Sequence, residues 1–215
     1  TNPCGVASDM DLENAYKKAF STDPTSAFGG VIALNQKVDS KVISSIMANQ
    51  FVEVIIAPDF DQEVINLLKK KENIRVLKGV KFKHLTKSYK YNSGVYLEQT
   101  DDSLDFEKIK LESNTKVKPD SNDINDLLFA MKVAKHVKSN AIVIAKDEMT
   151  LGIGAGQMSR VISTKIAFMK AKEEKLDVKD CVLASDAFFP FRDNIDIAAN
   201  LSLIHISEPT RLESI

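Results

Sequence analysis

The chain has 215 residues, of which 44% are hydrophobic and 27% are charged, and its formal net charge at pH 7 is −1. These values are those of an ordinary globular protein with room for one large domain or two small ones. The small net charge gives no support for a nucleic-acid partner, and no stretch reaches the roughly 18 apolar residues of a membrane span, so no membrane partner is expected either.

The first half of the chain alternates between predicted helices and strands, which favours an α/β fold around a parallel or mixed sheet. Helices are predicted to begin after Ser8 or Asp9 and after Asp39, because these side chains can cap a helix, and a third helix is predicted at 61–71. Strands are predicted at 28–34, 51–57, 74–77 and 94–99. The inward face of the third helix, at 61–71, is expected to consist of Val64, Ile65, Leu67 and Leu68.

The second half is predicted to follow a polar connection at 100–122, rich in Lys and Asp. A helix is expected from Ser121, then a buried strand at 141–145 and a polar turn at 146–148. A helix from Gln157 to about Lys175 and a buried strand at 181–184 complete the series. Because ligands of open α/β sheets bind beyond the carboxyl ends of strands, we expect a site after the glycine-rich stretch and after the last strand.

The glycine-rich stretch at 152–160 is the most informative segment. Gly152, Gly154 and Gly156 would let a ligand approach the backbone closely, and the start of the next helix offers N–H groups and positive dipole, with a fixed charge from Arg160. This combination suits a small anionic substrate. The alternative is a tight hairpin whose glycines serve packing. Gln157 stands where a dinucleotide fingerprint needs glycine, and no Walker spacing is present.

An aromatic loop at 185–194 is the second signal, because its phenylalanines are too dense for a solvated loop. It could stack a flat ring while a carboxylate binds the edge of the ring. The alternative is a hydrophobic plug, with Asp193 capping the next helix. The residues concerned are Asp186, Phe188, Phe189, Pro190, Phe191, Arg192 and Asp193.

The remaining candidates are weaker. Gly29, in a turn that feeds a strand, could admit a ligand or could mark a strand-entry bulge. Cys4 and Cys181 stand in no metal or redox spacing, which favours a reducing cytosol, and a buried thiol is the simpler interpretation of Cys4. His84 and His136 lie in lysine-rich surroundings and are expected to be solvated, so the chain offers no convincing general base.

Taken together, six motifs resemble one family. They are NPCGVA at 2–7, DPTSAFGG at 23–30, EVIIAP at 53–58, KSNAIV at 138–143, GIGAGQMSR at 152–160 and SDAFFPFRDN at 185–194. The family is that of AICAR formyltransferase/IMP cyclohydrolase, the bifunctional purine biosynthesis protein. The motifs run in the family's order over roughly residues 1–199 and belong to its formyltransferase domain.

The resemblance implies a cytoplasmic enzyme that transfers a formyl group from 10-formyltetrahydrofolate to AICAR in de novo IMP biosynthesis. It implies two cytidine-deaminase-like α/β/α subdomains with mixed sheets, at about 1–112 and 121–200. It also implies a homodimer with active sites across the interface and no metal. For AICAR it implies Gly29, Glu53, Asn140 and Arg160, and for the folate Val161, Phe188 and Asp193.

Two departures from the family set further expectations. In the family a Lys-His pair, with His as proton acceptor and Lys stabilising the transition state, directly precedes the motif at 1–5, whereas this chain begins at Thr1. At the other end, the family continues with a glycine-rich substrate loop and C-terminal strands, whereas here the pattern stops near Asn200. Residues 201–215 are typical of a translated sequencing adapter, the alternative being a divergent tail. With the cyclohydrolase domain also absent, we expect a fragment cut at both ends that has essentially no formyltransferase activity alone.

Two other functions stay open from the sequence. One is a non-catalytic nucleotide-binding module that keeps the pocket formed by Arg160 and the glycines. The other is a zinc deaminase, suggested only by the implied fold. No HxE motif followed by PCxxC occurs in the chain, which gives the deaminase no support.

Overall fold

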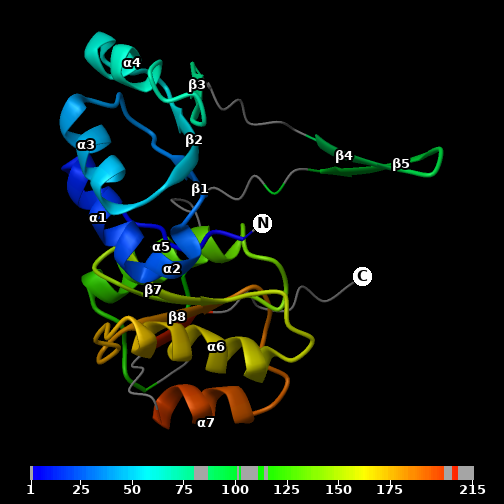
Figure 1. The fold of residues 1–215 in the computed structure, drawn as a ribbon. Coiled ribbons are helices and arrows are strands. Elements are labelled where there is room, and N and C mark those ends of the chain that lie inside the picture. The colour runs from blue at the N-terminus through cyan, green and yellow to red at the C-terminus, as the bar shows by residue number, and fades with distance from the viewer. Residues whose placement is uncertain are drawn as a thin grey trace.

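The computed structural model describes residues 2–79, 87–100, 102, 111–113 and 116–200, together with the backbone of 205–207. Thr1, His84 and most of the segment 201–215 lie outside the described residues. The described chain forms an α/β fold with two main sheets and a separate hairpin (Figure 1). No helix within these residues is long and apolar enough to cross a membrane.

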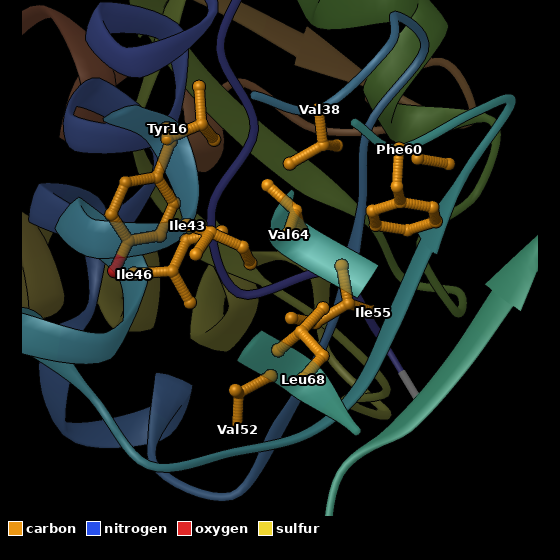
Figure 2. Packing of buried hydrophobic residues seen from close by; sticks show 11 residues of the cluster. Tyr16, Val38, Ile43, Ile46, Val52, Ile55, Phe60, Val64 and Leu68 are labelled. Atoms are coloured by element: carbon orange, nitrogen blue, oxygen red, sulfur yellow. The ribbon is translucent and has the colours of Figure 1, made fainter. Parts of the chain in front are cut away.

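The first sheet is parallel, in the order β1 (Gly30–Ala33), β2 (Val52–Ala57) and β3 (Arg75–Lys78). Its helices are α1 (Leu12–Thr22), α2 (Pro24–Ala27), α3 (Ser40–Asn49) and α4 (Gln62–Leu68). The core of this half is apolar and includes Tyr16, Ile43, Ile46 and Ile55, whose side chains converge in Figure 2. This half has the predicted alternation of helix and strand.

The helix starts show where capping was predicted well and where it was not. The carboxylate of Asp39 accepts a hydrogen bond from the N–H of Val42 at 2.9 Å, which confirms the predicted cap of α3. Neither Ser8 nor Asp9 caps α1, because Asp11 accepts from the N–H of Glu13 and Asn14, while Asp9 accepts from the N–H of Asp11.

The inward face of α4 is narrower than predicted. Val64 and Leu68 are buried, and Ile65 packs against the core in part, but Leu67 is 44% exposed. A helix of seven residues presents only one stripe to the sheet, and positions 64 and 68, four residues apart, occupy it. The prediction that Leu67 faces inward is therefore wrong.

A two-stranded hairpin projects from the body of the molecule (Figure 1). It consists of β4 (Lys87–Asn92) and β5 (Val95–Thr100), joined at Ser93 and Gly94, both of which have positive φ. Only β5 was predicted, since β4 is a lysine-rich stretch without an apolar run. All of its side chains are exposed except that of Ser88, which is half-buried.

The second sheet is mixed, in the order β7 (Met149–Gly154), β6 (Ile142–Lys146), β8 (Val182–Ser185) and β9 (His205–Ser207). Strand β6 is antiparallel to β7 and β8, and β9 runs parallel to β8. The helices of this half are α5 (Ser121–Ala134), α6 (Arg160–Glu173) and α7 (Asp193–Asn200). The described residues of the connection, 102, 111–113 and 116–120, contain no helix or strand.

Alternate residues of β6 serve two cores. Val143 and Ala145 belong to the apolar cluster with α5, whereas Ile142 and Ile144 belong to the cluster with α6. Because successive side chains of a strand point to opposite faces, the continuous apolar run at 141–145 is what a strand covered on both sides requires. The sheet therefore lies between two helical layers.

Candidate functional site

One edge of the second sheet gathers three segments that are far apart in the sequence. Ile142, at the start of β6, pairs with Gly154 at the end of β7 and with Ser185 at the end of β8. Because β6 is antiparallel to both neighbours, the residues before β6 meet those that follow β7 and β8. The expectation that the aromatic loop follows a strand end is confirmed, whereas the first part of the glycine-rich stretch lies within β7 and only its end, from residue 155, follows that strand.

Arg160 is the first residue of α6 and is anchored at this edge. Its Nη1 donates to the Ser185 hydroxyl at 2.9 Å and forms an ion pair with Asp186. The Arg160 side chain is 11% exposed and that of Asp186 is 20% exposed, so the pair is largely removed from water. Both contacts use Nη1, and no described contact uses Nη2 or Nε, so these groups are candidate donors for a ligand.

Asp186 organises the strand ends as well as Arg160. Its Oδ1 also accepts from the N–H of Ala141 at 3.1 Å, just before β6. Burial would raise the pKa of this carboxyl, but hydrogen bonds from Ser139 and Arg160 outweigh burial and hold the pKa below its ordinary value. Asp186 is therefore the counter-ion that keeps Arg160 at the sheet edge.

Asn140 lies beside the start of α6. Its Nδ2 donates to the carbonyl of Gln157 at 2.7 Å, and its own carbonyl accepts from the Ser163 hydroxyl at 2.7 Å. Ser163 is on the same helix as Arg160, so these bonds hold Asn140 against the helix that carries the guanidinium. No described contact uses the side-chain oxygen Oδ1 of Asn140, so it is a candidate acceptor for a ligand.

The interpretation of Gly152 and Gly154 as a ligand-binding turn is wrong. Both lie inside β7, and they face α6 so closely that a Cβ would stand 2.1 Å from the Ala167 carbonyl oxygen or 1.9 Å from that of Ser163. Their role is packing of helix on strand, the alternative left open from the sequence. Only Gly156 lies in the turn, with φ of 68° and open space around its α-carbon.

Gly29 and Glu53 meet at the edge of the first sheet. Gly29 has φ of 67°, and its N–H donates to the Phe51 carbonyl at 2.9 Å. A Cβ on Gly29 would lie 3.7 Å from Oε1 of Glu53, so the carboxylate stands over the bare backbone of the turn. The pairing of β1 with β2 shifts register between Gly30 and Val31, so the strand-entry irregularity considered for this turn is also present.

The residues that the resemblance assigns to the folate lie on the surface. Val161 is half-buried on α6, and the ring of Phe188 is 40% exposed. Asp193 is exposed and begins α7, where its carboxylate accepts from the N–H of Asn194 at 2.8 Å. Phe189 packs against the core beneath α6, so the alternative of a hydrophobic plug fits Phe189 but not Phe188 or Phe191, which is 72% exposed.

The N-terminal segment was singled out as a motif at 2–7, but its position beside the second sheet was not predicted from the sequence. Residues 6–8 run antiparallel beside β7, with the N–H of Thr150 donating to Val6 at 2.9 Å and the N–H of Ser8 to Glu148 at 2.9 Å. Oδ1 of Asn2 accepts from the N–H of Lys138 at 2.7 Å, two residues before Asn140. The segment therefore ends at the same sheet edge, a placement that rests on long-range pairing and not on a local pattern.

A cavity of about 1340 Å³ lies between the two halves. The N-terminal segment with Cys4, the loop with Gly29, and Gln157 and Lys170 line it. Burial, and then the nearby charge of Asp23, raise the pKa of the Cys4 thiol, and burial raises that of Cys181 to about 12. Both thiols are thus held in their less reactive, protonated form at neutral pH.

The candidate residues form two groups. Described contacts join Gly29 to Glu53 and Asn140 to the helix of Arg160, and no described contact joins the first pair to the second. His136 is exposed, as predicted. Within the described ranges, no group of three or more His, Cys, Asp or Glu side chains is arranged to hold a metal ion.

A comparison with models of known protein families places most of the chain in a family. Residues 1–170 match the family model described as AICARFT/IMPCHase bienzyme. The match covers 170 of the 215 residues and includes Gly29, Glu53, Asn140, Arg160 and Val161.

Proposed function

The chain belongs to the AICARFT/IMPCHase bienzyme family, and from this premise we propose that it carries binding surfaces for AICAR and 10-formyltetrahydrofolate in the formyl-transfer step. The observation that carries the proposal is the anchored Arg160 at the start of α6, with Asn140 beside it. The two residues converge where the carboxyl ends of β7 and β8 meet, the usual place for a ligand in an α/β sheet.

The AICAR phosphate is proposed to bind at Arg160. A guanidinium offers paired N–H donors that match phosphate oxygens, and the start of a fourteen-residue helix adds unpaired backbone N–H groups and positive dipole. Asp186 contacts the guanidinium only at Nη1 among the described contacts. The Oδ1 of Asn140 is available to the carboxamide N–H of AICAR, and Glu53 beside Gly29 offers a carboxylate to ribose hydroxyls.

The folate is proposed to lie over α6 and the start of α7. The exposed ring of Phe188 offers a face for stacking a flat pterin, and Val161 adds apolar surface. The exposed carboxylate of Asp193 is available to N–H donors on the edge of the ring. Val161 follows β7, and Phe188 and Asp193 follow β8, so all three lie beyond the same edge of the sheet as Arg160.

In the proposed reaction the amine of AICAR attacks the formyl carbon of the folate. A C–N bond forms to AICAR, the bond from the formyl carbon to N10 breaks, the amine loses a proton and N10 gains one. The amine is a weak nucleophile, so the step needs a base and stabilisation of the developing oxyanion. In the family a Lys-His pair next to the NPCG motif has these roles, and the contact of Asn2 with Lys138 supports a location for that pair beside Asn140.

We also propose a homodimer. A single chain leaves the Gly29–Glu53 group without a described contact to the Asn140–Arg160 group. A second copy would place each active site across the interface, as the resemblance implies, and both groups of one chain would then border that site. Sedimentation analysis at several protein concentrations measures this association directly.

Calorimetry with AICAR tests the proposed site. The wild-type chain is expected to bind AICAR, and Arg160→Ala is expected to weaken binding by about a hundredfold, since a charge-assisted contact to phosphate is worth roughly 1.5–3 kcal/mol. The control is Lys165→Ala, an exposed cation on the same helix, which should leave the affinity unchanged. Equal affinity of wild type and Arg160→Ala would contradict the proposal.

We expect the chain alone to bind AICAR but to have essentially no formyltransferase activity, because the family's Lys-His pair is not among its residues. An assay of FAICAR formation, with AICAR and 10-formyltetrahydrofolate, measures this, and substantial turnover by the purified chain would contradict the expectation. Folate binding is measured separately by titration, with Asp193→Asn expected to weaken it about tenfold.

A further inference from the structure

An ion pair joins the two halves of the molecule beside the candidate site. Asp23, between α1 and α2, pairs with Lys170 on α6, and the Lys170 Nζ lies 3.3 Å from the Ser26 hydroxyl. The Asp23 side chain is 7% exposed and that of Lys170 is 31% exposed. A pair this sheltered is screened less by water than an ordinary surface pair, so its loss should weaken the contact between the two halves.

Asp23 controls the loop that carries Gly29. Its Oδ1 caps α2 by accepting from the N–H of Ser26 at 3.0 Å, while Oδ2 faces Lys170. Helix α2 ends at Ala27, whose carbonyl accepts from Nε2 of Gln50 at 2.7 Å, and Gly29 lies two residues further on. The loop is therefore fixed at one end to its own sheet and at the other end to α6.

Lys170 stands on the helix that begins with Arg160, ten residues further along and about 15 Å away along the helix axis. That helix cannot shift easily against β7, because the bare α-carbons of Gly152 and Gly154 bring its backbone into direct contact with the strand. One rigid element thus reaches from the guanidinium at one end to the Gly29 loop near the other. In Figure 1, α2 and α6 lie on either side of β7.

We propose that Asp23 and Lys170 are positioning residues, which hold the loop of Gly29 and Glu53 in a fixed place relative to the helix of Arg160. The inference rests on the proposed function, since it assumes that AICAR uses contacts from both halves. Neither residue touches the substrate in this scheme. The pair keeps two distant sets of ligand contacts in a fixed relative position. Its loss should therefore lower the affinity for a ligand that uses both sets and leave unchanged the affinity for a ligand that uses only one.

Two ligands of different size test this. Lys170→Met removes the charge and keeps the length of the side chain, and Asp23→Asn removes the charge and keeps an acceptor for the N–H of Ser26. Each variant is expected to raise the Kd for AICAR about tenfold, in the range of coupling between residues in contact, and to leave the Kd for inorganic phosphate within about twofold. Lys170→Arg, which restores the cation, is expected to recover AICAR affinity to within about threefold.

The matched control is Lys41→Met. Lys41 also pairs with carboxylates of another element, Asp11 and Glu13, but it lies within the first half and is 59% exposed. Its loss should change neither affinity. An unchanged AICAR Kd in Lys170→Met would overturn the inference, and so would an equal loss of affinity for phosphate and AICAR, which marks general damage to the fold.

Hydrogen exchange tests the positioning role of the ion pair without relying on AICAR binding. The N–H of Gly29 is bonded to the Phe51 carbonyl, and it should exchange about tenfold faster in Lys170→Met than in wild type or Lys41→Met if the pair holds the loop. A wild-type chain that fails to bind AICAR refutes the proposed function. Unchanged exchange at Gly29 refutes the positioning role whether or not AICAR binds.

Discussion

At the scale of single residues, the candidate site depends on one carboxylate that does several things at once. Asp186 pairs with Arg160, accepts from the backbone of Ala141 and follows directly after β8. Arg160 is 11% exposed, and a buried guanidinium without a counter-ion is costly. The charge of Asp186 therefore stabilises the fold as well as holding Arg160 in the site.

Asp186→Asn is expected to lower the free energy of unfolding at pH 7 by about 1–3 kcal/mol, since Asn keeps a hydrogen-bond acceptor but leaves Arg160 without its counter-ion. The folded pKa of Asp186 lies below its ordinary value of 3.8, so its contribution is complete above that value. It is lost as the pH falls through the folded pKa. Urea unfolding of both proteins from pH 7 down to pH 3 should show the difference shrinking only below about pH 4.

The control for this prediction is the pair of Arg192 and Asp196 on α7. Its side chains are 85% and 49% exposed, so Asp196→Asn should change the free energy of unfolding by less than about 0.5 kcal/mol. An equal effect of the two substitutions, or a difference for Asp186→Asn that persists unchanged at pH 3, would contradict the role given to Asp186.

At the scale of elements, β7 and α6 pack with their backbones in direct contact. The glycines at 152 and 154 alternate with larger residues on one strand, and the helix backbone at Ser163 and Ala167 fills the space that side chains would occupy. Ser163 is fully buried and Ala167 is fully buried, as such an approach requires. The start of α6, and with it Arg160, is placed by this contact.

Gly154→Ala is expected to lower the free energy of unfolding by about 3 kcal/mol or more, because its Cβ would stand 1.9 Å from the Ser163 carbonyl oxygen, among rigid backbone atoms. Gly156→Ala is the matched control. It meets open space and carries only the penalty of a positive φ, about 1 kcal/mol. Urea unfolding measures both, and equal losses at the two positions would rule out the packing role.

The role of these glycines could not be predicted from the sequence, although some neighbouring elements could. The apolar run at 141–145 and the capping residue Asp39 predicted β6 and α3, because strand burial and helix capping are local properties. Whether a glycine serves a turn or a close contact depends on the partner across the interface, which the sequence does not name. Strand β4 escaped prediction for a related reason, since its stability comes from pairing with β5 and not from apolar residues.

The turn between β6 and β7 was predicted from its own residues, but it is stabilised by a residue of another element. The polar residues at 146–148 predicted a turn, and Asp147 and Glu148 both have φ of 51° there. The strain of two left-handed residues is offset by Asp126 on α5, whose carboxylate accepts from both of their N–H groups at 2.9 and 2.7 Å. Asp126 is about 20 residues away in the sequence, so no local sequence pattern predicts that it contacts this turn.

At the scale of the whole molecule, the two halves meet through buried polar groups. The hydroxyl of Thr22, at the end of α1, donates to the Thr150 carbonyl at 2.6 Å. The Thr150 hydroxyl accepts from the N–H of Val6 at 2.9 Å and lies 3.1 Å from its carbonyl. The α/β class and the order of elements were predictable, but this junction joins residues more than a hundred positions apart, so the arrangement of the two pairs of candidate residues was not.

Thr150→Val is expected to destabilise both halves together. It leaves the N–H of Val6 without its partner and removes the hydroxyl beside Thr22, which should cost about 1–3 kcal/mol of the free energy of unfolding. Thr150→Ser keeps the hydroxyl and should lose less than half as much. If Thr150 joins the halves into one cooperative unit, native-state hydrogen exchange will show equal losses of protection in β2 and β6. A loss confined to β6 and β7 would mean that each sheet unfolds independently, and that the register of the Gly29 loop with Arg160 depends on the ion pair of Asp23 and Lys170 alone.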